Sequence, residues 1–561
     1  MELKAERLSL FRDEWLLRSV YAHQRFLLHE AGFKELKVHV PTAGGKTLGA
    51  ILFALRDSFA EPLTLVRTIL TYPTNLLSRD QFEHSIVRAL TEWIGTSLPK
   101  VGVINPMERR FVPDGSPFEV SVGRGVPTYV FTLPPRFGSR DLYVSVITGE
   151  GLQHLFSEEN IIELGRRKGT YLLAVLEVLN QHDHIILCSP DLLGYVAQRC
   201  YSVTGGFYNP RWRDELEIKL ANHKVVVDEY HFYDPYTYLN LRNTLNKLQS
   251  ESLLLLSATA TGQFFPDAEV LNSQSVAEGC KADRNGDSIS SYPIEVSLHR
   301  AEMQVGDTTP QNQTIYFYHS AILAHETVER LRAMSARVTE WTGIRKATEQ
   351  GARLAIATSA AEVGLDLPFR EVHTEFWGNS WEISSIIQRI GRVGRSEEAG
   401  ESQAHIWITG REPKILFQLF EGKTVLSKAE FGDLLRGSFG EQSFRPVDYV
   451  SDYLWSEERT RELRRFWQIP PHDKTKLSFH FRPPNSQGVF NWGDHQFVYD
   501  WIPIANRYEV QKLKDTTDLP FWHEMGYSEW KVGAALDRRG YLTRYEGKKD
   551  KAHRRCFWRN P

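Results

Sequence analysis

Residues 37–47 read KVHVPTAGGKT, and this stretch decides the fold. Its first four residues are a short apolar run typical of a strand, and residues 48–59, LGAILFALRDSF, have the apolar spacing of a helix. Strand, glycine turn and helix start together predict a phosphate-binding loop, because backbone N–H groups and the positive end of the helix dipole face one point. Lys46 is expected to reach the β- and γ-phosphates, and the Thr47 hydroxyl is expected to bind Mg²⁺.

This loop departs from the full G-x-x-x-x-G-K-[ST] pattern at its first position, where Val40 stands in place of glycine. Ala43 also occupies a position that is glycine in many such loops. The alternative is a chance GGKT in a turn, which the flanking strand and helix disfavour. The nucleotide-binding residues predicted in the loop are Thr42, Ala43, Gly44, Gly45, Lys46 and Thr47.

A second motif is VVVDEYH at residues 225–231, an apolar strand that ends in two adjacent acids. A carboxylate at the carboxyl end of a parallel strand lies at the edge of the sheet where ligands bind. Asp228 is expected to hold Mg²⁺, and Glu229 is expected to orient or deprotonate the attacking water. His231 is either a satisfied polar residue or a relay from the nucleotide to the Ser-Ala-Thr turn at 257–259.

The most specific motif is IQRIGRVGR at residues 387–395, in which an arginine recurs at every third position. Its two glycines weaken a helix, so a plain solvated basic helix does not account for the pattern. Arg392 and Arg395 are candidate arginine fingers, which would stabilise charge on the γ-phosphoryl group. Gln388 is grouped with them as a catalytic candidate.

Composition bounds the function. The chain has 561 residues, and 67 Lys and Arg against 70 Asp and Glu give a net charge of −3, which excludes a histone-like polycation. Its length predicts about three domains with cores of their own. The four cysteines form no C-x-x-C pair, which excludes zinc ribbons and favours a reduced, intracellular compartment. No run of about 18 apolar residues is present, so no membrane span is expected.

Continuous apolar runs alternate with helical stretches through residues 37–420. Runs of Val, Ile and Leu without polar alternation are what a parallel strand covered on both faces requires. Strands separated by helices indicate βαβ units, so the predicted class is α/β with open parallel sheets. The expected strands lie at 37–40, 67–73, 184–190, 224–229, 252–259, 314–318 and 353–359.

Taken in order, the motifs resemble those of the superfamily 2 helicases, over about residues 15–410. Such a resemblance implies a motor of two tandem RecA-like domains with ATP between them. The segments that carry it are Gln24, GGKT (44–47), LTYPTNLL (70–77), LCSPDLL (187–193), DEYH (228–231), SAT (257–259), IYFYHS (315–320), ATSAAEVGLD (357–366) and QRIGRVGR (388–395).

The resemblance also implies roles for individual residues. Gln24 would contact the adenine, and Gly364 and Asp366 would form the nucleotide side of the fifth motif. Contacts to the nucleic-acid backbone would come from both domains, through Pro73, Thr74, Ser189, Pro190 and Thr358. Gripping the sugar–phosphate backbone rather than the bases would make unwinding independent of sequence. ATP and Mg²⁺ are the implied cofactors.

This reading divides the chain into three domains and a linker. Residues 1–270 would form the first RecA-like domain, with an insertion of loops and short strands at about 95–183. Residues 271–312, which are polar and contain one strand, would link it to a second RecA-like domain at 313–430. Residues 431–561 would form a smaller, mixed α/β accessory domain with a basic tail.

Within the superfamily, DEYHFYD at 228–234 is similar to the DE-x-H-x-YD of CRISPR-associated helicases of type I systems. The 182 positions between Lys46 and Asp228 fit those helicases too. An HD nuclease domain is not expected, because Gln24 lies so close to the start; the His-Asp dipeptides at 182–183 and 472–473 are interpreted as chance. This pattern resembles the separate helicase subunit of type I-D systems, and type I-A helicase subunits are the near alternative.

The expected function is therefore an ATP-dependent, single-stranded DNA translocase or helicase. It would be a monomeric motor in a prokaryotic cytoplasm, serving a CRISPR effector complex whose large subunit carries the nuclease. A stand-alone DNA-repair or RNA helicase is one alternative. A nucleic-acid-binding structural subunit with a degraded motor is another, against which the chemically competent ATP motifs argue.

Two basic segments are further candidates for nucleic-acid contact. Residues 531–561 hold ten Lys and Arg against three Asp and Glu, with aromatic residues between them, which suits either a single-strand-binding segment or a disordered terminus. The insertion offers either a strand channel or an ordinary solvated face. Its basic residues are Arg109, Arg110, Arg124, Arg136, Arg140, Arg166, Arg167 and Lys168.

Overall fold

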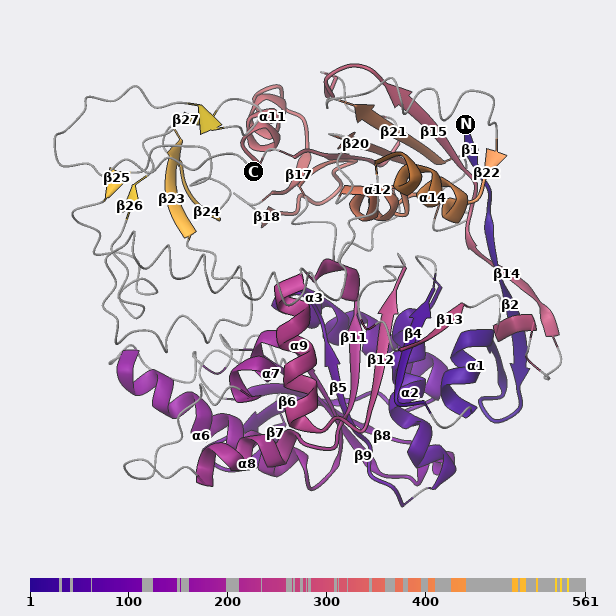
Figure 1. The fold of residues 1–561 in the computed structure, drawn as a ribbon, viewed down its shortest axis with the longest axis vertical. Helices are drawn as coiled ribbons and strands as arrows, with labels where there is room; N and C mark the ends of the chain where they lie inside the picture. Colours follow the sequence, from indigo (N-terminus) through magenta and orange to yellow (C-terminus); the bar gives the residue numbers. More distant parts are fainter. Residues whose placement is uncertain are drawn as a thin grey trace. The chain divides into compact units, whose positions relative to one another are not determined.

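The structure is a computed structural model of the full chain (Figure 1). It describes residues 1–29, 33–40, 44–61, 63–113, 125–148, 152, 161–197, 211–233, 235–258, 265, 268–272, 276–278, 280, 284–306, 310, 312–319, 321–342, 346–358, 369–376, 382–394, 402–408 and 425–439. Beyond these it describes the strands 487–492, 495–500, 511–512, 530–531, 535–536 and 542–543.

The chain folds into two units. An N-terminal unit comprises Ala5–Tyr292, and a C-terminal unit comprises Met1–Lys4 together with Pro293–Pro561. The chain therefore passes from one unit to the other twice. This division differs from the predicted one, because the expected linker at 271–312 contributes strands to both units.

Backbone pairing explains why that segment is not a simple linker. Strand β14 (Arg284–Ser291) pairs antiparallel with β2 (Glu6–Asp13) in the N-terminal unit. Strand β15 (Ile294–His299) pairs antiparallel with β1 (Glu2–Leu3) in the C-terminal unit. Their backbone N–H and C=O groups are thus satisfied by ladders rather than by water.

The N-terminal unit is built on one ten-stranded sheet, and the central strand β12 is buried along its whole length. Neighbours from β13 to β10, and β9 beside β10, run parallel. In spatial order the strands are β13 (Glu269–Asn272), β4 (Glu35–His39), β12 (Ser252–Ser257), β11 (Lys224–Asp228), β5 (Arg67–Thr71), β10 (Asp183–Cys188), β9 (Asp141–Ile147), β8 (Val126–Thr132), β6 (Lys100–Asn105) and β7 (Arg110–Pro113). The five strands predicted here from apolar runs are confirmed.

The segment predicted as an insertion of loops and short strands, at about 95–183, contains strands that extend this sheet. Strands β9, β8, β6 and β7 continue it beyond β10, and the last three join by antiparallel pairing. Antiparallel pairs tolerate polar and glycine residues on one face, which accounts for the weak apolar pattern of this stretch. Helix α6 (Ile161–Leu179) completes it.

Helices and a small sheet surround the large sheet of this unit (Figure 1). The small sheet has the order β14-β2-β3, with β3 at Arg18–Tyr21. The helices are α1 (Ala22–His29), α2 (Lys46–Ala60), α3 (Asn75–Asp80), the π-helices η1 (Gln81–Ile86) and η2 (Ala89–Ile94), α7 (Pro190–Ala197), α8 (Arg211–Leu220) and α9 (Pro235–Leu248), besides two short 3₁₀ turns, η3 (Pro135–Phe137) and η4 (Tyr230–Phe232).

The C-terminal unit is built on a nine-stranded sheet whose middle strands are parallel. In spatial order they are β18 (Lys346–Ala347), β17 (Val338–Trp341), β19 (Leu354–Ala357), β16 (Thr314–Phe317), β20 (Glu371–Phe376), β21 (Ser402–Ile408), β15, β1 and β22 (Val425–Leu426). The strands predicted at 314–318 and 353–359 are confirmed. The α/β class is likewise confirmed, since both units carry parallel-rich sheets flanked by helices.

Two apolar clusters hold helices against this sheet. Ile386 of α12 (Ile383–Ile390) and Phe431 of α14 (Lys428–Phe439) pack with Phe317 on one side. Val328 of α11 (Ala321–Ala333) packs with Tyr316 in the other cluster. Helix α14 crosses the predicted domain border at 430/431, so the sheet's core extends farther along the chain than predicted.

Beyond α14 the described part of the chain consists of short strands. A four-stranded sheet has the order β24-β23-β26-β25, and β27 pairs with β28. Their bounds are β23 (Gln487–Trp492), β24 (His495–Asp500), β25 (Gln511–Lys512), β26 (Trp530–Lys531), β27 (Ala535–Leu536) and β28 (Leu542–Thr543). The basic tail after Thr543 and His472–Asp473 lie outside the described residues.

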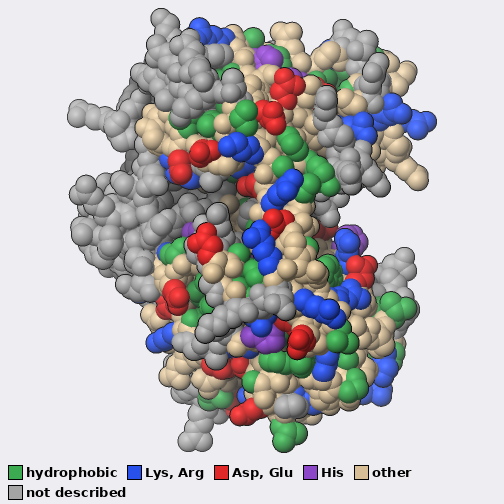
Figure 2. All heavy atoms as spheres, turned by 90° about the vertical axis from the view of Figure 1, so that its right-hand side faces the viewer, with side chains coloured by type: hydrophobic (Ala, Val, Ile, Leu, Met, Phe, Trp, Pro, Cys, Tyr) green, Lys and Arg blue, Asp and Glu red, His purple; other side chains and the backbone are tan. Residues whose placement is uncertain are grey.

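The charged side chains on the surface are of both signs, as the composition predicts. The face drawn in Figure 2 carries Lys and Arg side chains interspersed with Asp and Glu, as a net charge of −3 leads one to expect. Among the described residues, no helix combines the length and apolar character that crossing a membrane requires.

A buried polar network joins three strands of the C-terminal sheet. His373 Nε2 lies 2.8 Å from Glu371 Oε1, and Trp407 Nε1 donates to His373 Nδ1 over 3.1 Å. Because an indole nitrogen only donates, the proton of neutral His373 sits on Nε2 and points at Glu371. His405 Nε2 approaches the same oxygen to 3.4 Å, and Thr314 Oγ1 donates to Glu371 Oε2. The cluster is therefore a hydrogen-bonded carboxylate, with no lone pair at His373 Nε2 for a metal ion.

This network predicts acid-sensitive stability. Hydrogen bonds from His373 and His405 hold the pKa of Glu371 well below its ordinary value of 4.5. A lowered pKa means that the unfolded chain binds the proton first, so the stabilisation is complete above about pH 4.5 and is lost as the pH falls below it. Glu371→Gln should lower the free energy of unfolding by about 1–3 kcal/mol at pH 7, because donors lose their acceptor.

Urea unfolding of parent and variant at pH 7, 5 and 4 measures this effect. The gap between the two proteins should narrow between pH 5 and 4. Glu295→Gln is the matched control, since Glu295 is an exposed acid on the neighbouring strand β15, and it should change stability by less than about 0.5 kcal/mol. A gap that is equal at all three pH values would contradict the assignment.

Candidate active site

The glycine turn leads directly into helix α2, which begins at Lys46. Gly45 has a φ of 72°, and a Cβ added there would lie 2.3 Å from Gln24 Nε2. Only glycine suits both the left-handed backbone and that close approach. Thr42 and Ala43 lie outside the described residues.

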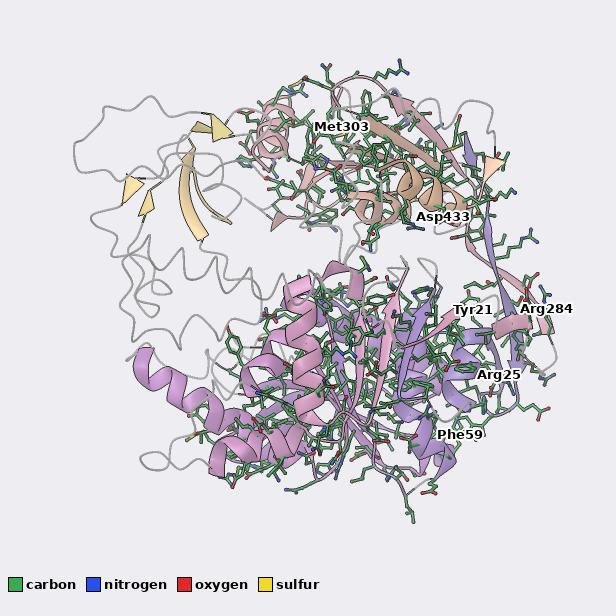
Figure 3. All side chains as sticks on the ribbon, in the orientation of Figure 1. Tyr21, Arg25, Phe59, Arg284, Met303 and Asp433 are labelled. Carbon is green, nitrogen blue, oxygen red and sulfur yellow. The ribbon has the colours of Figure 1, made fainter. Side chains whose placement is uncertain are left out.

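Helix α1 holds this turn from its first residues, near Tyr21 and Arg25 as labelled in Figure 3. Gln24 Nε2 donates to the Gly45 carbonyl over 3.0 Å, and Gln24 Oε1 accepts from the Tyr21 N–H over 3.0 Å. His23 is fully buried and hydrogen-bonds to the backbone of Gly44. Burial lowers the pKa of His23 to about 3, so the ring is neutral. The sequence pattern did not indicate His23; its only signal is its place beside Gln24.

The structure brings Lys46 and the acidic motif together. The Lys46 ammonium hydrogen-bonds to Glu229 Oε1 and lies 4.0 Å from Asp228 Oδ1. Strands β4 and β11 flank β12 in parallel, so their carboxyl ends meet at one edge of the sheet. This edge is where the sequence places the phosphate site.

Backbone geometry at the acids is unusual. Glu229 has a φ of 50°, a left-handed conformation that is uncommon for a residue with a side chain. Its N–H donates to Asp228 Oδ1 over 2.9 Å. Burial raises the pKa of Asp228 to about 7, with Glu229 adding to the rise and the Lys46 charge opposing it. A divalent cation at this position would hold Asp228 ionised.

The predicted metal ligands Thr47 and Asp228 offer a hydroxyl and a carboxylate oxygen, which are donors that Mg²⁺ prefers. Thr47 Oγ1 donates to Gln81 Oε1 over 3.0 Å. Both residues therefore fit the cation in chemistry. Gln81 is a site residue that the sequence motifs did not indicate, because it belongs to no helicase motif that the chain displays.

Contacts behind the acids tie three strands together. His231 Nδ1 lies 2.8 Å from Ser257 Oγ and 3.4 Å from Glu229 Oε2. The contact on which the relay hypothesis depends is thus present, and the relay itself stays a prediction. Tyr230 is buried, and its hydroxyl hydrogen-bonds with His39 Nε2 over 2.8 Å, at the end of β4.

The nucleic-acid residues predicted in this unit lie at strand ends. Thr74 is exposed and caps α3, accepting from the Leu77 N–H over 3.2 Å. Pro73, Ser189 and Pro190 are buried, so their side chains pack rather than project. Thr74 is therefore the one of the four whose side chain is open to solvent.

The arginines of the predicted insertion divide into two kinds. Arg140 Nε pairs with Asp183 Oδ2 at 3.0 Å, and Arg136 Nη1 donates to the Trp15 carbonyl over 3.1 Å. Both are partly buried anchors rather than channel residues. Arg109 is exposed. The side chains of Arg124, Arg166, Arg167 and Lys168 lie outside the described residues.

Helix α12 carries the arginine motif in the C-terminal unit. Gln388 and Arg389 are buried; Arg389 Nη1 donates to Thr374 Oγ1 over 2.9 Å, and its guanidinium lies 5.2 Å from the Phe317 ring centre. Arg389 thus fixes the helix to the sheet. Arg392 follows the helix end and is partly exposed. Arg395 lies outside the described residues.

Thr358 follows strand β19, and its N–H donates to the Trp341 carbonyl over 3.1 Å. Thr358 is buried, with only 5% of its surface exposed, so it offers little area for contact with a nucleic acid. Gly364 and Asp366 lie outside the described residues. The roles of all three residues stay predictions.

Residues 296–398 match the family described as CRISPR-associated nuclease/helicase Cas3, C-terminal. A CRISPR-associated helicase Cas3 from Thermoproteus tenax is 25% identical over 382 residues, which are 62% of this chain and 61% of that protein. Over these stretches the chain is similar to CRISPR-associated Cas3 helicases. It spans about three fifths of the length of that curated relative.

Solved structures agree on the fold. The crystal structure of T. fusca Cas3 superposes with a TM-score of 0.51 and 14% identity, covering 93% of this chain and 67% of that one. At this identity the likeness concerns architecture alone. The predicted fold of two tandem RecA-like domains is confirmed.

The left-handed Gly45 yields a direct prediction. Gly45→Ala should weaken nucleotide binding at least about tenfold, because the new Cβ meets Gln24 and the backbone must abandon its left-handed conformation. Titration with a fluorescent ATP analogue measures the affinity. Gly437→Ala is the control, since a Cβ there meets nothing within 4 Å, and it should bind as the parent does. Parental affinity in Gly45→Ala would refute the proposed loop geometry.

Proposed function

We propose that this chain is an ATP-dependent, single-stranded DNA translocase and helicase. It would unwind target DNA for a CRISPR type I, I-D-like interference complex, with the nuclease supplied by a partner subunit. The observation that carries the proposal is the meeting of Lys46 with Asp228 and Glu229 at the carboxyl edge of the sheet, beside a glycine turn held by Gln24. The kinship with Cas3 helicases supports the CRISPR context.

Each residue has a chemical task in this reaction. Lys46 would leave the acids to hold the β- and γ-phosphates, which frees Glu229 to orient the attacking water. Arg392 and Arg395 would stabilise the charge that develops on the γ-phosphoryl oxygens. Mg²⁺, held by Thr47 and Asp228, would neutralise phosphate charge when bound. Positioning and electrostatics then supply most of the rate enhancement.

Coupling to DNA would run through the backbone-contacting residues. Thr74, with its exposed side chain at the α3 cap, would contact phosphate directly. Pro73, Ser189, Pro190 and Thr358 are buried, so any contact that they make would come mainly through the backbone at their strand ends. Such contacts read no bases, so translocation would be independent of sequence.

The contacts of Asp183 indicate that the His182–Asp183 dipeptide is not part of a nuclease site. Asp183 Oδ1 accepts from the Val66 N–H over 2.7 Å, and Asp183 Oδ2 pairs with Arg140. Both oxygens are engaged in joining β10 to its surroundings, so the His182–Asp183 dipeptide is structural. The proposal assigns DNA degradation to a nuclease-bearing subunit of the effector complex, in a prokaryotic cytoplasm.

Lys46→Ala tests the motor. Hydrolysis of ATP should fall by about 10² or more, because the ammonium stabilises the transferring phosphoryl group. Release of phosphate is measured with no nucleic acid, with single-stranded DNA and with single-stranded RNA. Lys100→Ala, at an exposed lysine of the same unit, should hydrolyse ATP as the parent does.

Two outcomes would go against the proposal. A Lys46→Ala protein with the parent's rate would remove the catalytic site. A parent that responds to RNA and not to DNA would favour an RNA helicase over the interference role.

A further inference from the structure

One helix joins the nucleic-acid side of the N-terminal unit to its nucleotide side. Helix α3 begins at its cap, Thr74, and continues without a break into the π-helix η1, whose first residue is Gln81. At the cap, Thr74 Oγ1 accepts from the Leu77 N–H, and Ser78 Oγ donates to the Thr74 carbonyl. At the other end, Gln81 Oε1 accepts from the Thr47 hydroxyl over 3.0 Å.

The Gln81 end of this helix is firmly held. Phe82 is completely buried and stacks on Tyr129, with ring centres 4.2 Å apart and planes 5° from parallel. η1 also packs against α2, the helix that carries Thr47. π-helical turns are rare and are frequently found at functional sites. The side chain of Gln81 is thus presented to Thr47 by a fixed backbone.

A hydroxyl has one proton and two acceptor lone pairs. When the proton of Thr47 is given to Gln81, the lone pairs are left for a cation. In the structure the Thr47 hydroxyl donates to Gln81 Oε1, while Asp228 Oδ1 accepts from the Glu229 N–H. Outer partners of this kind orient ligands and change metal affinity by about 10–100-fold when removed.

We propose that Gln81 is a positioning residue for the magnesium ion of the bound nucleotide, acting through the Thr47 hydroxyl. This inference rests on the proposed function. Because the same helix is capped by Thr74, Gln81 also ties the metal ligand to the residue expected to hold DNA. Nucleic-acid binding at the cap would then change the binding of the Mg²⁺–nucleotide complex through the helix formed by α3 and η1.

Two substitutions separate the hydrogen bond from simple packing. Gln81→Met keeps the length of the side chain and removes the acceptor, whereas Gln81→Glu keeps an acceptor oxygen. His84→Gln is the control, because His84 is exposed three residues along the same π-helix. Thermal unfolding of each variant checks that the unit remains folded.

Affinity for a fluorescent ADP analogue is measured with Mg²⁺ and with EDTA. Gln81→Met should lose at least about tenfold of the affinity gained from Mg²⁺, with its affinity in EDTA unchanged. Gln81→Glu and His84→Gln should keep the parent's gain. In Gln81→Met, the stimulation of ATP hydrolysis by single-stranded DNA should fall as well.

The results distinguish this inference from the proposed function. If the parent shows Mg²⁺-dependent binding and Gln81→Met keeps all of it, the positioning role is overturned and the motor assignment stands. If Gln81→Glu loses as much as Gln81→Met, the acceptor role is overturned. A parent without Mg²⁺-dependent nucleotide binding would overturn both proposals.

Discussion

The contact of Lys46 with two adjacent acids is the interaction on which the N-terminal unit depends for its chemistry. Three ionisable groups meet there at low exposure, and one cation faces two carboxylates. Burying two carboxylates costs free energy, and the single Lys46 charge offsets only part of that cost, so a second positive charge near the acids would be stabilising. Parallel strands β4 and β11, with β12 between them, bring the groups to one edge. The order of strands in the sheet therefore determines whether these three groups meet at all.

Much of this order could be predicted from the sequence, because its signals are local. The segments 225–227 (VVV) and 253–256 (LLLL) are uniformly apolar, as a strand buried on both faces requires. Asp228 directly follows the first segment, and Lys46 follows the strand at 37–40 through the glycine turn, so their place at the carboxyl edge follows from the α/β class. The sequence leaves two alternatives open for His231, a satisfied polar residue or a relay to the turn at 257–259, and the structure has a contact of 2.8 Å between His231 Nδ1 and Ser257 Oγ.

Strands that pair with partners far away in the chain could not be predicted from such local signals. Glu2–Leu3 pairs with β15, and the two strands lie almost three hundred residues apart in the chain. A two-residue strand has no periodicity, and nothing in a polar stretch reveals its distant partner. The border between the two units does fall within the predicted linker at 271–312, but the distant pairing of the strands in that stretch could not be predicted for that reason. Phe431 was likewise assigned to a separate domain, because a sequence does not show which core an amphipathic helix covers.

The departure of the glycine turn from its usual pattern has a structural counterpart. Val40, in place of the first glycine, is buried, and its N–H donates to the Ser257 carbonyl over 3.1 Å, so pairing with β12 runs one residue past the end of β4. Side chains from outside the turn hold its last two residues: Gln24 binds Gly45, His23 binds the backbone of Gly44, and α1 carries both. The turn is thus held by a neighbouring helix where a glycine-rich loop would rely on its own backbone.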